Sequence, residues 1–197
     1  MNESLFDDQA DEVFSKLEHY VFAALETYSN VHRGSGHNSI LTTLLYETAR
    51  DNVLEYLGLR KGKYVVIFCT PRRAEIIGKI LDQSRYKVIS SRDIGFPVGI
   101  MAIAVEKKAL PKDIPFLSGG GTARLVSPNW VIWARAPERF EAGTPAIINI
   151  IAFARALIML KHSGKSSLKI ENNNKLNPEQ KLNNDELIGY TLIELLD

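Results

Sequence analysis

The segment Arg139-Phe-Glu-Ala-Gly-Thr-Pro145 constrains the fold of this 197-residue chain more than any other, because it leads directly into an apolar stretch. Gly143 allows a tight turn, Thr144 can cap a helix through its hydroxyl, and Pro145 suits the first helical position. The segment therefore predicts a helix from Ala146 to about Leu160. The start of such a helix offers free backbone N–H groups and the positive end of the helix dipole, which attract phosphate. The alternative is an ordinary capped helix without a ligand.

Helical and strand-like segments alternate along the rest of the chain, which predicts an α/β fold. Asp11–Tyr28 and Ile40–Leu57 have apolar residues at helical spacing, and Gly58 is expected to end the second helix. Tyr64–Cys69 is a short apolar run typical of a buried strand, and Pro71 opens a helix through about Leu81. The further predicted strands are Tyr86–Ser90, Gly99–Val105 and Val131–Ala134.

Charge and cysteine content exclude several classes of protein. The chain has 24 Lys and Arg against 23 Asp and Glu, so its net charge of +1 argues against a broad nucleic-acid surface or a polybasic membrane anchor. The single cysteine, Cys69, cannot form an internal disulfide, and the acidic N-terminus does not read as a secretory signal, which favours the cytoplasm. Asn149 and Arg155 interrupt the longest apolar stretch, so no membrane span is expected.

The chain is predicted to contain one domain and a tail. Residues 1–162 are expected to form a single α/β domain. Residues 163–185 are polar, with almost no apolar side chains, and read as a linker. Residues 186–197 are expected to form a short amphipathic helix that needs tertiary contacts to persist.

Four motifs occur in the order typical of one known family. They are Asn30-Val-His-Arg-Gly34, Tyr46-Glu-Thr-Ala-Arg50, Gly119-Gly-Gly-Thr122 and Arg139-Phe-Glu-Ala-Gly-Thr-Pro145. The chain resembles the class V aminotransferase and cysteine desulfurase family over roughly Tyr28–Leu59 and Pro97–Gly164. The resemblance implies a pyridoxal phosphate (PLP) enzyme of aspartate-aminotransferase fold, and a homodimer with its active sites at the subunit interface. The expected fold is a reduced version of the family's large domain, with a mixed sheet flanked by helices.

The sequence departs from the family at the position of its Schiff-base lysine. That lysine follows a histidine and lies four residues before a Pro-Phe-Gly-x-Gly turn, to which Pro97 and the residues after it align. Counting back gives Asp93, and Arg92 replaces the histidine that would stack on the cofactor ring. A carboxylate cannot form an imine, because that chemistry needs an amine nucleophile. We therefore expect no catalytic residue, and any bound PLP would be held without a covalent bond.

Two further regions of the family are expected to be missing. Thr70 and Asp93 are separated by little more than one helix and one strand, where family members carry many more residues. The family's glycine-containing phosphate turn also reads Thr70-Pro-Arg-Arg73. The chain ends soon after His162, without the smaller C-terminal domain that holds the substrate-carboxylate arginine. It is expected to be too short for a complete enzyme of this class.

The predicted ligand site combines the glycine cluster with the start of the last helix. Gly120, Gly121, Thr122 and Thr144 would meet around an anion such as the phosphate of PLP. The cationic or imidazole side chains expected near them are His32, Arg33 and Arg72. Thr144 could instead act only as a helix cap, and Arg33 could instead pair with a neighbouring carboxylate.

The remaining reactive side chains give weaker signals. His32 and His37 lie five residues apart without a Cys or carboxylate pattern, which favours a loop role over a zinc site. Cys69 ends an apolar strand, which favours a buried small hydrophobic residue over a persulfide-carrying nucleophile. Lys107 stays open as a substitute for the missing lysine.

Two functions are compatible with the sequence. The first is a shortened class V aminotransferase-like protein that has lost imine chemistry and serves as a binding or dimerisation module. The second is the N-terminal part of a longer PLP-dependent enzyme, whose lysine comes from another segment or from a partner chain. The sequence favours the first, and a symmetric homodimer that binds a small anion is the expected form.

Overall fold

The computed structural model describes residues 3–32, 35–164 and 167–168, with side chains from Phe14 onward. Residues 169–197 hold most of the predicted linker and all of the predicted C-terminal helix, so these two predictions lie outside the described residues. Leu168 is described and buried, and its N–H donates to the carbonyl of Ile94 at 2.8 Å. The chain is therefore still in contact with the domain four residues after Gly164.

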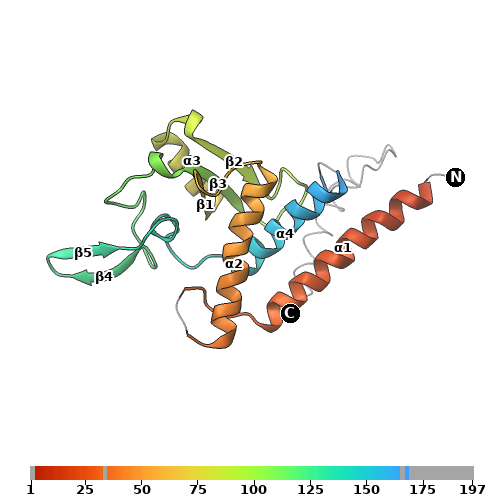
Figure 1. Ribbon diagram of the computed structural model, residues 1–197, viewed down its shortest axis with the longest axis horizontal. Coiled ribbons are helices and arrows are strands. Elements are labelled where there is room, and N and C mark those ends of the chain that lie inside the picture. The colour runs from red at the N-terminus through yellow and green to blue at the C-terminus, as the bar shows by residue number, and fades with distance from the viewer. Residues whose placement is uncertain (1–2, 33–34, 165–166, 169–197) are drawn as a thin grey trace, which may run out of the picture.

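A three-stranded sheet forms the centre of the fold (Figure 1). Its strands, in spatial order, are β1 (Tyr64–Cys69), β3 (Met101–Glu106) and β2 (Tyr86–Ser90). The bounds predicted for β1 and β2 are confirmed. β3 pairs antiparallel with both neighbours. The sequence predicts a mixed sheet, but every strand pairing in the described residues is antiparallel, because β3 enters between the two parallel outer strands and separates them.

Helices cover both faces of this sheet, which makes the domain a three-layer α/β fold. They are α2 (His37–Tyr56) and α4 (Ile147–Ser163) on one face and α3 (Pro71–Ile80) on the other. The alternation of side chains along β1 explains the layers. Val66 and Phe68 join the core under α2 and α4, while Ile67, between them, packs with Ile77 of α3. The continuous apolar run of β1 is therefore a strand buried on both faces, as predicted.

The helices begin and end close to the predicted residues. α2 ends at Tyr56, and Gly58 then adopts a left-handed φ of 65°, which suits a glycine after a helix. α4 ends at Ser163, where Gly164 has a φ of 70°. The first helix, α1 (Glu3–Glu26), starts earlier than predicted and packs against α4. The short 3-10 helices are η1 (Gln83–Arg85), η2 (Lys107–Ala109) and η3 (Glu138–Phe140).

The two polar residues inside the apolar sequence of α4 have contacts of their own. The guanidinium of Arg155 lies 4.9 Å from the ring centre of Tyr20 in α1. The amide of Asn149 donates to the carbonyl of Val98 at 3.3 Å. Both residues tie α4 to neighbouring parts of the domain. No helix in the described part of the chain combines the length and apolar character needed to cross a membrane.

A β-hairpin projects from the body of the domain, at the left of Figure 1. It consists of β4 (Ala123–Ser127) and β5 (Trp130–Trp133), which among the described residues pair with each other and with no other strand. β5 is close to the strand predicted at 131–134, whereas β4 was not predicted. Large apolar side chains of the hairpin are solvent-exposed, and these are Leu125, Val126, Trp130, Val131 and Ile132.

Candidate functional site

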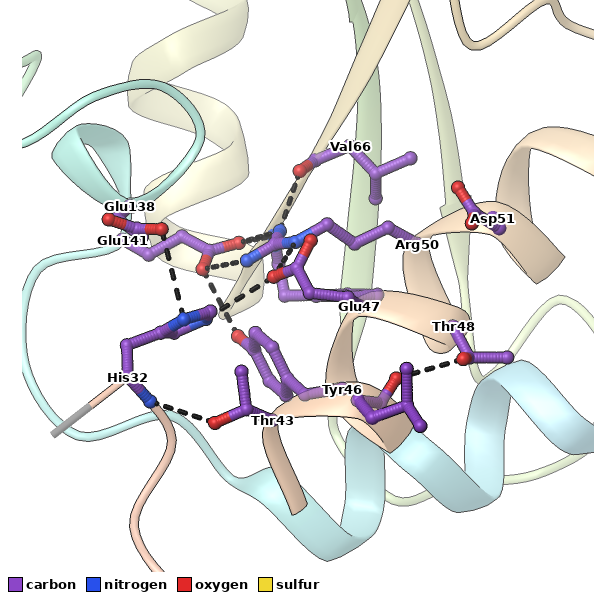
Figure 2. Close-up of polar contacts among 12 residues, drawn as sticks. His32, Thr43, Tyr46, Glu47, Thr48, Arg50, Asp51, Val66, Glu138 and Glu141 are labelled. Atoms are coloured by element: carbon purple, nitrogen blue, oxygen red, sulfur yellow. Dashed lines mark hydrogen bonds and ion pairs between the residues drawn. The ribbon is translucent and has the colours of Figure 1, made fainter. Parts of the chain in front are cut away.

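Two of the sequence motifs meet in a buried ion pair. Arg50, from the Tyr46–Arg50 motif on α2, binds Glu141, from the Arg139–Pro145 motif, through two parallel contacts (Figure 2). The Nη1–Oε1 distance is 2.7 Å and the Nη2–Oε2 distance is 2.8 Å. The two side chains are only 5% and 9% exposed. A bidentate arrangement of this kind is the strongest pairing of a guanidinium with a carboxylate.

The remaining hydrogen-bonding capacity of the pair is used by the surrounding elements. The N–H of Phe68 donates to Glu141 Oε1 at 2.6 Å, and the Tyr46 hydroxyl donates to Oε2 at 3.1 Å. Arg50 also donates to the carbonyl of Val66 at 2.7 Å. A buried ion pair is tolerated only when such additional bonds satisfy its atoms. The cluster therefore joins α2, β1 and the loop before α4.

The electrostatics of this cluster do not favour acid–base chemistry. Burial raises the pKa of the Tyr46 phenol far above its usual range, and the charge of Glu141 adds to the shift. Burial alone would lower the pKa of Arg50, but the charge of Glu141 outweighs it and raises that pKa. At neutral pH Tyr46 is therefore a neutral phenol and Arg50 a fixed cation. Each of the two groups therefore keeps one protonation state at neutral pH.

A pocket of about 650 Å³ opens beside the ion pair. Its lining residues come from the loop before α2, the base of the hairpin, η3 and the loop before α4: Asn30, Val31, His32, Tyr46, Gly121, Ala123, Arg124, Ala134, Arg135, Glu138, Glu141, Gly143, Thr144, Pro145 and Ile147. Three of the predicted site residues, His32, Gly121 and Thr144, lie together in this lining. That these residues hold a ligand stays a prediction.

His32 lies between two carboxylates at one wall of the pocket (Figure 2). Its Nε2 is 3.2 Å from Glu47 Oε1, and its Nδ1 is 3.9 Å from Glu138 Oε1. Its backbone has a left-handed φ of 55°, and its N–H donates to Thr43 Oγ1 at 3.0 Å. His32 therefore links α2 to η3. Among the described residues no group of three His, Cys, Asp or Glu side chains is placed as metal ligands would be.

The glycine cluster is bonded mainly to its own surroundings. Thr122 is fully buried, and its hydroxyl donates to the Gly119 carbonyl at 2.7 Å and accepts the Gly119 N–H at 3.1 Å. The Gly143 N–H donates to the carbonyl of Gly120 at 2.8 Å. The Ala134 N–H donates to the Thr122 carbonyl at 2.8 Å. These bonds fasten the base of the hairpin to the loop before α4.

The predicted cap of α4 is wrong. The residue before the helix is Ala146, and no side chain caps it. Ala146 has φ −76° and ψ 74°, the geometry of an inverse γ-turn, and the Ile147 N–H donates to the Pro145 carbonyl at 2.9 Å. This turn fixes Ile147 as the first helical residue and leaves Pro145 outside the helix. Thr144 is exposed, and its hydroxyl makes no hydrogen bond to any described residue.

The other predicted site residues lie apart from the pocket or outside the described residues. Arg33 belongs to the residues that are not described. Arg72 is exposed on the first turn of α3 and does not line the pocket, whereas its neighbour Arg73 donates to the carbonyl of Ala142. Thr70 is the residue before α3 and is exposed.

Asp93 has a structural role in a turn after β2. Its Oδ2 accepts the N–H of Ser90 at 2.7 Å, and its own N–H donates to the Ser90 hydroxyl at 3.2 Å. Asp93 is exposed and does not line the pocket. The residue that the sequence resemblance predicts at the lysine position is therefore a turn-forming carboxylate.

The sequence patterns do not indicate several residues of the site. Arg50 and Glu141 belong to motifs that do not predict their pairing, and no motif contains Arg124 or Arg135. One signal was available: Arg50 follows Tyr46 by four residues on the apolar stripe of a helix, next to Ala49 and Val53. A charge on a buried stripe requires a partner of opposite charge. Glu141 could not be found in that way, because it lies 91 residues further along the chain.

Comparison with known proteins identifies the family. The model of the family described as "Aminotransferase class-V" matches residues 74–189. The chain belongs to the class-V aminotransferase family. A probable cysteine desulfurase of Halobacterium salinarum is 33% identical over 111 residues, which are 55% of this chain and 26% of that protein. A cysteine desulfurase of Escherichia coli is 35% identical over 85 residues, 42% of this chain and 21% of that protein.

The structural comparison gives the same fold. The apo structure of a cysteine desulfurase from Thermococcus onnurineus superposes with a TM-score of 0.56 at 17% identity, covering 77% of this chain and 64% of that one. The predicted resemblance and the α/β fold class are therefore confirmed. The chain spans about a quarter of the length of the curated relatives it matches.

The residues of the pocket suit the phosphate group of PLP but not the imine that PLP forms with a lysine. An imine needs an amine, and in the described part of the chain no lysine lines the pocket. The pocket does offer groups suited to a phosphate, because Arg124, Arg135 and Thr144 all line it. Its residues are therefore compatible with a phosphate group and unsuited to covalent attachment of the cofactor.

Proposed function

We propose that this chain is a shortened class-V aminotransferase-like protein that performs no imine chemistry and acts as a binding or dimerisation module. The observation that carries the proposal is Asp93, whose carboxylate accepts the Ser90 N–H in a turn, at the position that the sequence resemblance assigns to the family's lysine. The fully bonded Arg50–Glu141 pair supports the same conclusion, since it uses motif residues for structure.

Reductive trapping tests the loss of imine chemistry. The protein is incubated with PLP, reduced with borohydride and digested, and pyridoxyl adducts are mapped by mass spectrometry. We expect only low, scattered labelling of surface lysines, equal to the labelling of the urea-unfolded protein. Stoichiometric labelling of one lysine in the folded protein, Lys107 included, would overturn the proposal.

The cofactor and assembly proposals follow from the same family relationship. PLP, if it binds, is held by its phosphate in the pocket without a covalent bond. The protein forms a symmetric homodimer, which is supported by the exposed apolar side chains of the hairpin. The cytoplasm is the proposed location, because a single cysteine cannot form an internal disulfide, which suits a reducing compartment.

A second candidate is an N-terminal part of a longer PLP-dependent enzyme, such as a cysteine desulfurase-like protein. It is favoured by the coverage of the relatives, of which this chain matches about a quarter of the length. Sequencing the natural transcript tests it. A reading frame that continues beyond Asp197 into a segment with a lysine-bearing active site would favour this candidate over a binding module.

A further inference from the structure

Two arginines at the base of the hairpin point to a ligand site that the family motifs do not include. Arg124 and Arg135 both line the pocket, together with His32 and Glu138. They come from neighbouring strand ends, since the Ala134 N–H donates to the carbonyl of Thr122. This hydrogen bond holds the two chain segments side by side, so Arg124, which follows Thr122, and Arg135, which follows Ala134, reach the same pocket.

An irregularity in the hairpin explains why Arg124 faces the pocket. Ala123 pairs with Trp133, and the next pair is Leu125 with Ile132, so Arg124 is an extra residue in β4. Successive residues of a regular strand point to opposite faces, but a bulge redirects a side chain. Ala123 and Arg124 consequently both line the pocket.

Neither guanidinium has a partner within the described residues. Two arginines near the pocket are engaged: Arg139 Nε donates to the Ala134 carbonyl at 2.7 Å, and Arg50 is bound to Glu141. Arg124 and Arg135 make no such bond to the described part of the chain, and both are exposed to solvent. Both residues line the pocket, so their donors are free to bind a ligand there, and a guanidinium keeps its charge at any physiological pH.

One of the two carboxylates of the pocket is balanced by a fixed cation. Glu141 is paired with Arg50 through both oxygens, whereas Glu138 lies 3.9 Å from Nδ1 of His32, which is charged only when it is protonated. The two arginines of the lining therefore outnumber the one carboxylate without a fixed cation, and the net charge left for a ligand is positive. The glycine turn offers few donors to a ligand, because the Thr122 hydroxyl and the Gly143 N–H already form hydrogen bonds within the chain.

We propose that Arg124 and Arg135, with the hydroxyl of Thr144, bind the phosphate group of a small phosphate monoester. The proposal rests on the proposed function, since it names the ligand class of the same pocket. A phosphate monoester carries close to two negative charges at neutral pH and several acceptor oxygens, which match two guanidinium forks and one hydroxyl. Recognition is directed at the phosphate, so the rest of the ligand contributes less to binding.

Calorimetry with simple ligands tests the site. Inorganic phosphate, glycerol 3-phosphate, PLP and pyridoxal are titrated into the full chain. We expect the three phosphates to bind and pyridoxal, which has the ring without the phosphate, to bind at least about tenfold more weakly, since a hydrogen bond to a charged group is worth that factor or more. Equal affinities for PLP and pyridoxal would overturn the proposal, as would the absence of phosphate binding to the wild type.

Variants locate the site. Arg124→Ala and Arg135→Ala are each expected to weaken glycerol 3-phosphate binding about tenfold or more, and Thr144→Ala to weaken it less. Arg124→Lys keeps a charge and should retain part of the affinity. Arg92→Ala and Arg72→Ala are the controls, because both arginines are exposed and lie outside the pocket lining. Circular dichroism verifies that each variant is folded.

The outcomes separate this inference from the proposed function. Phosphate binding that is unchanged in both Arg124→Ala and Arg135→Ala, or that is lost in Arg72→Ala alone, would overturn the assignment of the site and leave the loss of imine chemistry intact. A stoichiometric borohydride-trapped lysine adduct, together with loss of binding in the two arginine variants, would overturn the proposed function and leave the phosphate site intact.

Discussion

At Arg50 a positive charge is placed on the stripe of α2 that packs into the core, and its neighbours there, Ala49 and Val53, are apolar and buried. Such a residue is tolerated because Glu141 and the carbonyl of Val66 accept hydrogen bonds from its guanidinium. The rings of Tyr46 and Phe68 lie 4.8 and 5.3 Å from the guanidinium and add cation–π contacts. The charged residues Arg50 and Glu141 of two motifs thus have a structural role in this domain.

Removing one partner of this pair should destabilise the domain strongly. Arg50→Met leaves the Glu141 carboxylate buried with only the Tyr46 hydroxyl and the Phe68 N–H. We expect the free energy of unfolding to fall by about 3–5 kcal/mol, the range for an uncompensated buried charge. Urea denaturation followed by circular dichroism measures it. Lys79→Met is the control, because it removes an exposed ion pair with Glu75 and should change stability little. Similar losses in both variants would contradict the role given to Arg50.

Cys69 should react slowly with thiol reagents in the folded protein. Burial raises the pKa of its thiol to about 12, with a further contribution from the charge of Glu141. The reactive species is the thiolate, so its alkylation rate should still rise with pH above pH 10 in the folded protein and level off near pH 9 in urea. The same pKa shift makes the stability of the fold depend on pH, because the thiol of the unfolded chain loses its proton at lower pH than the buried thiol. The contribution of the protonated thiol to the free energy of unfolding is complete below about pH 9 and decreases as pH rises toward 12. A folded-state plateau below pH 9 would refute the burial of this thiol.

At the scale of elements, local sequence patterns predicted most of the fold. The bounds of β1 and β2, the ends set by Gly58 and the helix at Pro71 depend on apolar runs and on glycine or proline, which act within a few residues. β4 was missed because Arg124 and Ser127 stand among its few apolar residues, and none of its side chains is fully buried. α4 starts at Ile147, next to the predicted Ala146, but a γ-turn at Ala146, rather than the predicted Thr144 cap, determines this start.

The candidate site was predictable only in part, for a related reason. Gly121, Thr144 and His32 were found through motifs whose residues are adjacent in sequence. The pairing of Arg50 with Glu141 and the bulge at Arg124 depend on contacts between distant segments and on strand register. No local pattern specifies those contacts. Sequence therefore indicated where the pocket lies, while its charged walls follow from the tertiary structure.

The loop before α4 depends on the conformation of Gly143. Its φ of 91° is one that a residue with a side chain rarely adopts, and a Cβ placed there would be 3.7 Å from Arg73 Nη2, which is an ordinary contact. The cost of Gly143→Ala is therefore backbone strain, about 1–3 kcal/mol of stability. Thermal unfolding measures it. Gly62→Ala is the control, with no atom within 4 Å of the added Cβ, and should be neutral or slightly stabilising. Equal melting temperatures for the two variants would contradict this account.

At the scale of the whole molecule, the body of the domain and the hairpin differ in how they are stabilised. The sheet is covered on both faces by helices, whereas the hairpin has two strands, free edges and exposed apolar side chains (Figure 1). A two-stranded hairpin alone is only marginally stable in water, and exposed edges and apolar faces favour pairing with another chain. A second copy of this chain offers an identical surface, and a symmetric contact between two such hairpins would cover both.

Charges placed on one face of the hairpin should therefore weaken the homodimer. Leu125 and Ile132 are cross-strand partners and are 53% and 51% exposed. We expect the wild type to sediment as a dimer at tens of micromolar, and Leu125→Lys with Ile132→Lys to shift it toward monomer with at least a tenfold higher dissociation constant, because burying two ammonium groups opposite their symmetry copies is unfavourable. Ile80→Lys is the matched control, since Ile80 is 57% exposed at the end of α3 and lies outside the hairpin. A wild type that stays monomeric at every concentration would refute the dimer itself, whereas a dimer equally stable in the hairpin variant would place the interface on another surface of the domain.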